Sequence, residues 1–246
     1  MRVDVRPAAT RFVTATDWME SRHSFSYGPH YDPGNAGFGL LVAHNDDLLQ
    51  PGGGFSEHPH RGVDIVTWVV AGALSHSDDV GGVGVVTPGV VQVLSAGCGV
   101  RHSEHNASDS VARYVQMWVS SDDAGAPRYS RADAAAGVDE FRVVASGGSD
   151  TAPLRLRQPA ARLLAASMSA GRQTALPRGM FVHLFVVDGA VLLGDVPLLP
   201  GDAARVADGD SLPVTATDDA QLLAWAMDAE VWRPPPPHQG AERAAG

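Results

Sequence analysis

The feature that most limits the fold of this chain is the close recurrence of short apolar stretches between Gly, Pro, Asp and Asn residues. These stretches are rich in Val, Leu, Ile and aromatic residues, and a series of short strands with frequent turn signals is typical of a sandwich or barrel. Helical turns are expected only at Asp17–Ser21 and Ser130–Ala136. We therefore predict an all-β protein. The predicted strands are 38–43, 63–70, 74–78, 90–94, 113–119, 141–145, 163–168, 181–187, 190–193, 214–217 and 221–227.

The strand rhythm breaks between Ser120 and Glu140, where Asp, Gly, Pro, Arg and Ala accumulate. A second strand-rich block follows, and it weakly echoes the first, which suggests a duplicated β-barrel unit. We predict an N-terminal domain over residues 1–136, a C-terminal domain over 137–233, and a Pro-rich disordered tail over 234–246.

Bulk composition excludes several classes of protein. The chain has 246 residues with 28 acidic and 18 basic side chains, and a net charge of -10 argues against direct nucleic-acid binding. The single cysteine, Cys98, rules out an intrachain disulfide and a multi-cysteine zinc site. The longest apolar run, Ile65–Leu74, is too short to span a membrane, and Met1–Trp18 is too polar for a signal peptide. We expect a monomeric cytoplasmic protein.

Two short stretches have the residues of a metal site. They are His58-Pro59-His60 and His102-Ser103-Glu104. In a β-strand the first and third residues of such a stretch lie on the same face, because side chains alternate with a period of two. Two strands facing each other would then supply three imidazoles and one carboxylate. This is a coordination shell for one divalent metal with positions left open for substrate.

The same stretches resemble known motifs. Gly52, His58 and His60, with Gly99, His102 and Asn106, have the spacing of the two cupin superfamily motifs. The chain is more specifically similar to the pirin family. The runs that resemble pirin are His58-Pro59-His60-Arg61-Gly62, Gly97 to Glu104, His23 to Tyr27, Tyr31-Asp32-Pro33 and Asn45-Asp46-Asp47.

The resemblance implies two tandem cupin-type jelly-roll barrels, of which the first binds a metal through His58, His60, His102 and Glu104. The general cupin pattern would place the carboxylate shortly after His60, where Asp64 stands; the pirin pattern favours Glu104 and leaves Asp64 an outer or structural role. In the second block His183 is alone, since Phe181 and Phe185 are its neighbours on the same face. We therefore expect that unit to bind no metal.

Other polar and aromatic residues admit two interpretations each. Cys98 is either a small buried turn residue or a redox-sensitive thiol, and the first reading is favoured because Arg101 is the one basic neighbour. His76 could have a role at the metal site or be a buried structural residue. His105 points away from Glu104 on a regular strand. Trp68 and Trp118 are most simply core residues, although either could form the wall of an aromatic pocket.

The resemblance implies quercetin 2,3-dioxygenase activity on a flavonol or similar enediol-type aromatic, with dioxygen as co-substrate and Glu104 as the catalytic base. Iron(II) is the first choice of metal, but the ligand set also accommodates nickel, cobalt, manganese, copper or zinc. Two alternatives stay open at this point. One is a non-catalytic metal- or redox-sensing regulator that binds a protein partner. The other is a cupin isomerase without oxygen chemistry.

Overall fold

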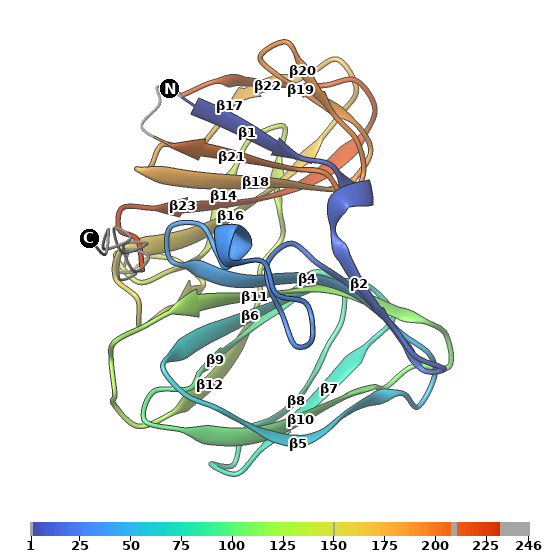
Figure 1. Cartoon of the computed structure of the whole chain (residues 1–246), viewed down its shortest axis with the longest axis vertical. Coiled ribbons are helices and arrows are strands. Elements are labelled where there is room, and N and C mark those ends of the chain that lie inside the picture. Colours follow the sequence, from blue (N-terminus) through green and yellow to red (C-terminus); the bar gives the residue numbers. More distant parts are fainter. Residues whose placement is uncertain (1, 150, 208–210, 232–246) are drawn as a thin grey trace, which may run out of the picture.

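The chain forms four β-sheets stacked in layers, with two large sheets in the middle and a small sheet outside each (Figure 1). The computed structural model describes residues 2–149, 151–207 and 211–231. The predicted tail at 234–246 lies outside the described residues. Each half of the chain contributes one large and one small sheet, so the prediction of an all-β protein with two cupin-type units is confirmed.

The first half contains a seven-stranded sheet in the order β12-β9-β6-β11-β4-β3-β2 and a four-stranded sheet in the order β5-β10-β7-β8. Side chains that point between these two sheets are therefore enclosed on both sides. The strands are β2 (Phe12–Ala15), β3 (Met19–His23), β4 (Leu41–Leu49), β5 (Gly54–His60), β6 (Val63–Ala71), β7 (Leu74–Asp78), β8 (Val83–Val86), β9 (Val90–Ser95), β10 (Val100–Asn106), β11 (Ala112–Ser120) and β12 (Arg128–Asp133).

The second half contains an eight-stranded sheet in the order β1-β21-β18-β23-β16-β14-β15, with β13 paired to β16, and a four-stranded sheet in the order β17-β22-β19-β20. Its strands are β1 (Arg2–Arg6), β13 (Gly137–Val138), β14 (Arg142–Ser146), β15 (Leu154–Arg155), β16 (Ala161–Met168), β17 (Gln173–Ala175), β18 (Phe181–Asp188), β19 (Val191–Leu193), β20 (Val196–Leu198), β21 (Ala203–Ala207), β22 (Pro213–Ala216) and β23 (Ala220–Met227).

The first strand of the chain belongs by its hydrogen bonds to the second half. Strand β1 runs antiparallel to β21, with Arg2 opposite Ala207 and Arg6 opposite Ala203. These residues fall in the predicted N-terminal domain, because adjacency in sequence is the one guide to pairing that a sequence offers. The predicted boundary between residues 136 and 137 stays a prediction.

The two large sheets pack face to face through one apolar cluster. Val115 and Met117 of β11 meet Phe185 and Trp225 of the second half in this cluster, and all four are buried. The Trp225 indole Nε1 lies 3.1 Å from the Met117 sulfur. Because alternate residues of a strand point to opposite faces, this layer uses one face of each large sheet and leaves the other face for the interior of its own sandwich.

The two predicted helical turns are wrong. The expected helical turns at Asp17–Ser21 and Ser130–Ala136 overlap strands β3 and β12, which are held by pairing with β4 and β9. Tertiary pairing has overridden the weak local propensity. The predicted barrels are sandwiches: within the described residues, the large and small sheets of each half are separate and do not close by strand pairing.

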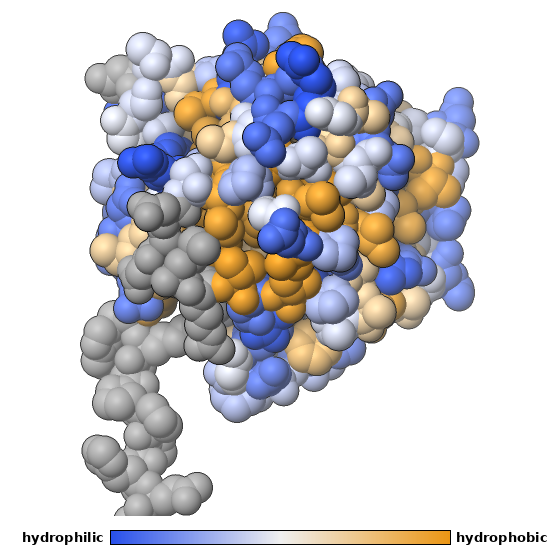
Figure 2. Space-filling model, turned by 90° about the horizontal axis from the view of Figure 1, so that it is seen from above, coloured by the Kyte–Doolittle hydropathy of each residue, from blue (hydrophilic) through white to orange (hydrophobic). Residues whose placement is uncertain are grey.

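The two helices in the described residues are single 3-10 turns, η1 (Ala8–Thr10) and η2 (Pro33–Asn35). Neither is long or apolar enough to cross a membrane. Figure 2 shows the end of the molecule that the second half forms, where hydrophobic side chains gather toward the middle and hydrophilic side chains surround them.

Candidate metal centre and pocket

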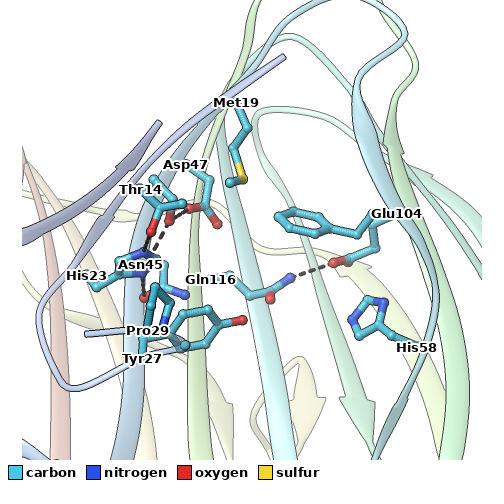
Figure 3. A pocket seen from close by; sticks show the side chains of 13 residues that line it. Thr14, Met19, His23, Tyr27, Pro29, Asn45, Asp47, His58, Glu104 and Gln116 are labelled. Atoms are coloured by element: carbon cyan, nitrogen blue, oxygen red, sulfur yellow. Dashed lines mark hydrogen bonds between the residues drawn. The ribbon is translucent and has the colours of Figure 1, made fainter. Parts of the chain in front are cut away.

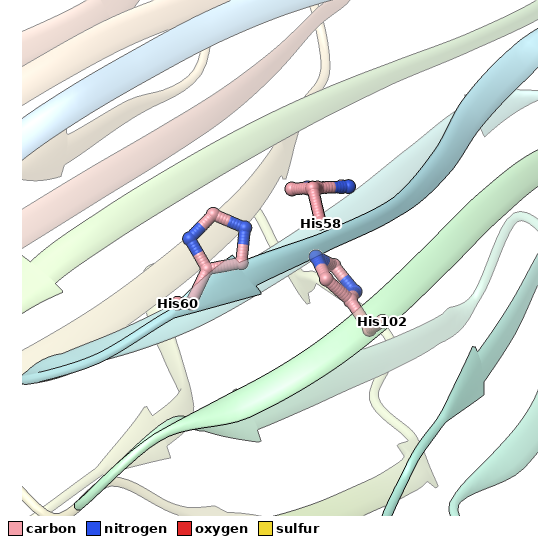
Figure 4. Close-up of side chains that lie close together, drawn as sticks. All are labelled: His58, His60 and His102. Atoms are coloured by element: carbon pink, nitrogen blue, oxygen red, sulfur yellow. The ribbon is translucent and has the colours of Figure 1, made fainter.

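Three predicted ligands converge on adjacent strands of the small sheet. Strands β5 and β10 are antiparallel neighbours, and their register sets His102 directly opposite His58. The ring centroids of His58 and His102 are 4.5 Å apart, and that of His60 lies 4.8 Å from His58 and 4.9 Å from His102. Each of the three offers a ring nitrogen within 4.8 Å of the other two (Figure 4). One small cation could therefore reach all three.

The hydrogen bonds of these imidazoles leave nitrogens free to bind a metal. Nδ1 of His58 lies 2.8 Å from the carbonyl oxygen of Ser56, which can only accept, so Nδ1 carries the proton and Nε2 has the lone pair. Nε2 of His60 and Nε2 of His102 are buried, and neither has a hydrogen-bond partner among the described residues. Buried polar atoms are nearly always paired. The residues present therefore fit a bound divalent metal.

A chain of contacts through His76 orients His102. Nε2 of His76 lies 3.0 Å from a carboxylate oxygen of Asp78, and Nδ1 of His76 lies 3.4 Å from Nδ1 of His102. An ionised carboxylate only accepts, so Nε2 of His76 donates to Asp78, and its Nδ1 accepts the proton of His102 Nδ1. This leaves the Nε2 lone pair of His102 for a metal, as outer-shell partners do in many metal sites. His76 thus has a role at the site.

Burial keeps two of these histidines uncharged. Desolvation, with a smaller contribution from the nearby imidazoles, lowers the pKa of His60 to about 4 and that of His102 to about 2. Both rings are therefore neutral at physiological pH, which is the state that binds metals.

The fourth predicted ligand, Glu104, is near the histidines but does not complete their group. Its carboxylate groups with His76 and His102 within 4.8 Å, and it accepts hydrogen bonds from the side-chain amides of Gln92 at 2.8 Å and Gln116 at 2.6 Å. The register shifts between His102 and Glu104, so that Glu104 lies opposite Phe55. Regular strand alternation does not predict this irregularity.

Burial also makes the Glu104 carboxyl a weak acid. Desolvation raises its pKa to about 7, and the hydrogen bonds from Gln116 and Gln92 oppose part of the increase. A carboxyl with this pKa exchanges its proton readily near neutral pH, which suits a general base.

Several other sequence-based candidates lie outside this cluster. Asp64 is fully buried and accepts the backbone N–H groups of Arg157 and Gln158 at 2.8 and 2.9 Å, so its role is structural. Cys98 is exposed, which contradicts the buried turn residue that we favoured, although it does lie in a turn. His105 is exposed, as expected from strand alternation.

His183 lies between the two large sheets, where its ring centroid is 4.8 Å from that of His44. It is therefore outside the interior of the second sandwich. Trp68 is a core residue, as predicted, and it packs in the same layer between the halves. Trp118 is half-buried, and its ring meets that of His60 edge-on at 4.7 Å.

A pocket opens beside the histidines between the two sheets of the first half. Its cavity volume is about 120 Å³, and it is open to solvent on one side. Figure 3 shows two polar walls: His58 and Glu104 on one side, and Thr14, His23, Asn45 and Asp47 on the other. Gln116 lies between the walls and donates to Glu104.

Sequence reasoning did not assign a role to the second polar wall. His23 and Asp47 belong to the runs that resemble pirin, but they were used there as a signature and not as site residues. A usable signal was present, since Asn45 and Asp47 alternate on β4 and share one face. What was missing was the pairing of β3, β4 and β11, which brings this face to the pocket.

Aromatic rings connect the two walls. The His60 ring contacts Trp118, Trp118 contacts the edge of Tyr27 at 5.4 Å, and Tyr27 stacks on His23 at 4.7 Å with an interplanar angle of 18°. Met19 and Phe55 add apolar surface to the pocket. The rings that line the pocket, those of Tyr27, His23 and Phe55, suit a flat, largely apolar ligand.

Comparison with known sequences identifies both halves. The pirin family profile matches residues 5–119, and the quercetinase C-terminal cupin domain profile matches residues 143–227. A protein of Mycobacterium tuberculosis, named as a candidate quercetin 2,3-dioxygenase, is 44% identical over 240 residues, which is 93% of this chain and 96% of that protein. The quercetin 2,3-dioxygenase of Escherichia coli is 33% identical over 227 residues, covering 89% of this chain and 96% of the relative.

Solved structures show the same fold. The bacterial pirin YhhW of Escherichia coli, solved in complex with nickel(II), superposes with a TM-score of 0.86 at 29% sequence identity. The match covers 94% of this chain and 100% of the YhhW chain. The similarity therefore extends over both sandwiches and not only over the half with the histidine cluster.

Proposed function

Since this chain belongs to the pirin family, we propose that it is a mononuclear metal-dependent dioxygenase that cleaves quercetin or a similar flavonol. The observation that carries the proposal is the convergence of three imidazoles, two of them with unpaired buried nitrogens, beside a pocket that is lined by His58 and by a carboxyl of pKa about 7. The names of the relatives point to the same reaction.

The proposed metal ligands are His58, His60, His102 and Glu104. When bound, a divalent metal would act as a Lewis acid that lowers the pKa of a substrate hydroxyl and holds the resulting oxyanion. Iron(II) is our first choice for this chain, and nickel(II), the metal in the solved relative, is the strongest competitor. The ligand types do not distinguish these two metals.

In this proposal Glu104 removes the proton of the substrate hydroxyl. Its pKa of about 7 lies far above that of an ordinary glutamate, so its ionised form is a stronger base. Gln92 and Gln116 each donate a hydrogen bond to the carboxylate, which fixes its orientation while the proton is taken up. Burial of the group also keeps bulk water from competing for the proton.

The aromatic row holds the substrate ring. Tyr27 and Phe55 line the pocket and offer flat apolar surface, and Trp118 supports Tyr27 edge-on, so that a planar substrate would be oriented with its oxygen functions toward the histidines. Correct orientation of this kind supplies a large part of many catalytic rate enhancements.

The test is oxygen uptake and carbon monoxide release from quercetin by protein loaded separately with iron(II) and nickel(II), with the metal content verified. We expect turnover with at least one metal. Glu104→Gln should lower kcat/KM about 100-fold or more, because the base is lost while its shape is kept. Glu57→Gln is the matched control, since Glu57 is an exposed carboxylate on the same strand as His58 and pairs with Arg101. No oxygen uptake by fully loaded protein would refute the proposal.

A further inference from the structure

The wall of the pocket opposite the histidines contains a second buried carboxyl, that of Asp47. The side chain lines the pocket from β4, and the residue is 3% exposed. One of its oxygens accepts a hydrogen bond from the Ser21 hydroxyl on β3. Neither histidine cluster with metal-binding geometry in the described part of the chain includes Asp47. Its place in the pocket is therefore not explained by the proposed metal site.

Hydrogen bonds fix the groups around Asp47. Nδ1 of His23 lies 3.0 Å from Oδ1 of Asn45, and Nε2 of His23 lies 2.9 Å from the Thr14 hydroxyl. The Ser21 hydroxyl lies 3.3 Å from the same Nδ1. An ionised carboxylate can accept about four hydrogen bonds, of which Ser21 supplies one. The wall is thus an ordered polar surface with acceptor capacity directed at the pocket.

Burial makes the charged Asp47 carboxyl costly to the folded chain, and the nearby Arg11 guanidinium offsets only part of this cost. Desolvation raises the pKa of Asp47 to about 7, and the charges of Asp46 and Glu104 add to the increase. A hydrogen-bond donor that enters the pocket would relieve this cost, because it would take the place of the lost water. The pocket geometry and the acceptor capacity therefore both indicate a ligand with a donor group at this end.

We propose that Asp47 forms a second substrate subsite, which accepts a phenolic hydroxyl of an aromatic substrate whose other oxygen functions face His58 and Glu104. A phenolic hydroxyl donates strongly to a carboxylate, and the Tyr27 ring lines the same pocket, where it offers flat surface to the substrate rings between the two ends. The proposal rests on the proposed function for the identity of the ring substrate. It adds a requirement for a hydroxyl at the end of the molecule remote from the metal.

The test compares two flavonols that differ in the hydroxyl groups of one ring: quercetin, which has two there, and galangin, which has none. Binding to metal-loaded protein is measured anaerobically by titration calorimetry, so that no turnover occurs. We expect Asp47→Asn to weaken quercetin binding about tenfold or more and to change galangin binding less than about twofold. Asp46→Asn is the matched control, because Asp46 precedes Asp47 on β4 but points to the other face and pairs with Arg113 at 3.0 Å. It should leave the preference for quercetin unchanged.

Each other outcome overturns the subsite. An equal loss of affinity for both flavonols in Asp47→Asn would show that Asp47 has a structural role. Equal affinity of the unmodified protein for both flavonols, or failure to bind either one, would refute the subsite. The oxygen-uptake assay tests the dioxygenase proposal separately from this binding measurement. Selective binding that depends on Asp47 without any oxygen uptake would sustain the subsite and refute the dioxygenase, and turnover without selectivity would do the reverse.

Discussion

The two halves of this protein share one layered plan but fill their interiors differently. In the second half, a single continuous cluster of apolar side chains occupies the space between the large and small sheets. In the first half, two smaller apolar clusters form, one around Leu49 and Tyr114 and the other around Ile65 and Leu94. The polar groups of the pocket lie in the same sandwich. One half is therefore specialised for packing, and the other gives up part of its core for chemistry.

The central strands β11 and β23 show the difference residue by residue. Both place apolar side chains such as Met117 and Trp225 in the layer between the halves. The opposite face of β23 offers Leu222 and Ala224 to its apolar core, whereas the equivalent face of β11 includes Gln116, which binds Glu104. Strand alternation allows one face of a sheet to change while the other is kept.

The largest expected effect separates the halves by metal binding. His102→Ala should lower metal affinity more than about 100-fold, because it removes a proposed ligand at the centre of the cluster. His183→Ala changes a fully buried histidine of the second half and should leave the metal content unchanged. Elemental analysis and chelator competition measure both. Stoichiometric metal in His102→Ala would contradict the proposed ligand set.

The polar interior should also make stability depend on pH. The pKa of Asp47 is raised from 3.8 to about 7 in the folded chain, so the folded state holds this proton more tightly than the unfolded chain does. The resulting stabilisation is present below about pH 4 and is lost as the pH rises to about 7, at most about 4 kcal/mol. Denaturant unfolding of metal-free protein should therefore show the unmodified chain losing stability relative to Asp47→Asn across this interval. A constant difference between the two would show that burial does not raise this pKa.

A substitution in the apolar interior of the second half should lower stability without changing metal binding. Leu184 is fully buried in its core, and Leu184→Ala should cost about 3 kcal/mol of unfolding free energy through lost burial and a residual cavity. Metal affinity should not change, because the residue lies in the other sandwich. Thermal and denaturant unfolding with a metal assay test the separation. A parallel loss of metal would show that the halves are coupled.

The smallest expected effect concerns the contacts behind the ligands. His76→Phe keeps an aromatic ring against Tyr129, on which His76 stacks at 4.2 Å, but it removes the acceptor for His102 Nδ1–H. Metal affinity should fall about tenfold. His105→Phe, at an exposed position on β10, is the control and should have no effect. Equal affinities in the two variants would remove His76 from the site.

Local pattern and the family resemblance were sufficient to predict most of the strands and the convergence of His58, His60 and His102. Parity within a strand depends only on backbone geometry, which is why His58 and His60 could be placed on one face; that the two stretches meet was expected from the resemblance, and they do so on adjacent strands of one sheet. The register shift before Glu104 and the partners of Asp47 arise from pairing between distant strands. Residues such as Gln92 and Gln116 give no signal alone, because an amide in a strand is ordinary until the carboxylate beside it is known.

The pairing of β1 with β21 has a consequence for how the chain is made. Strand β1 is separated in sequence from its partner by about 200 residues, with Arg2 opposite Ala207. It must wait unpaired during synthesis until that partner is made, and such long-range closure is slow. A second half made without residues 2–6 would expose the free edge of β21, a surface prone to pairing between molecules. A peptide of residues 2–6 could pair with this free edge and so complete a chain from which it had been separated.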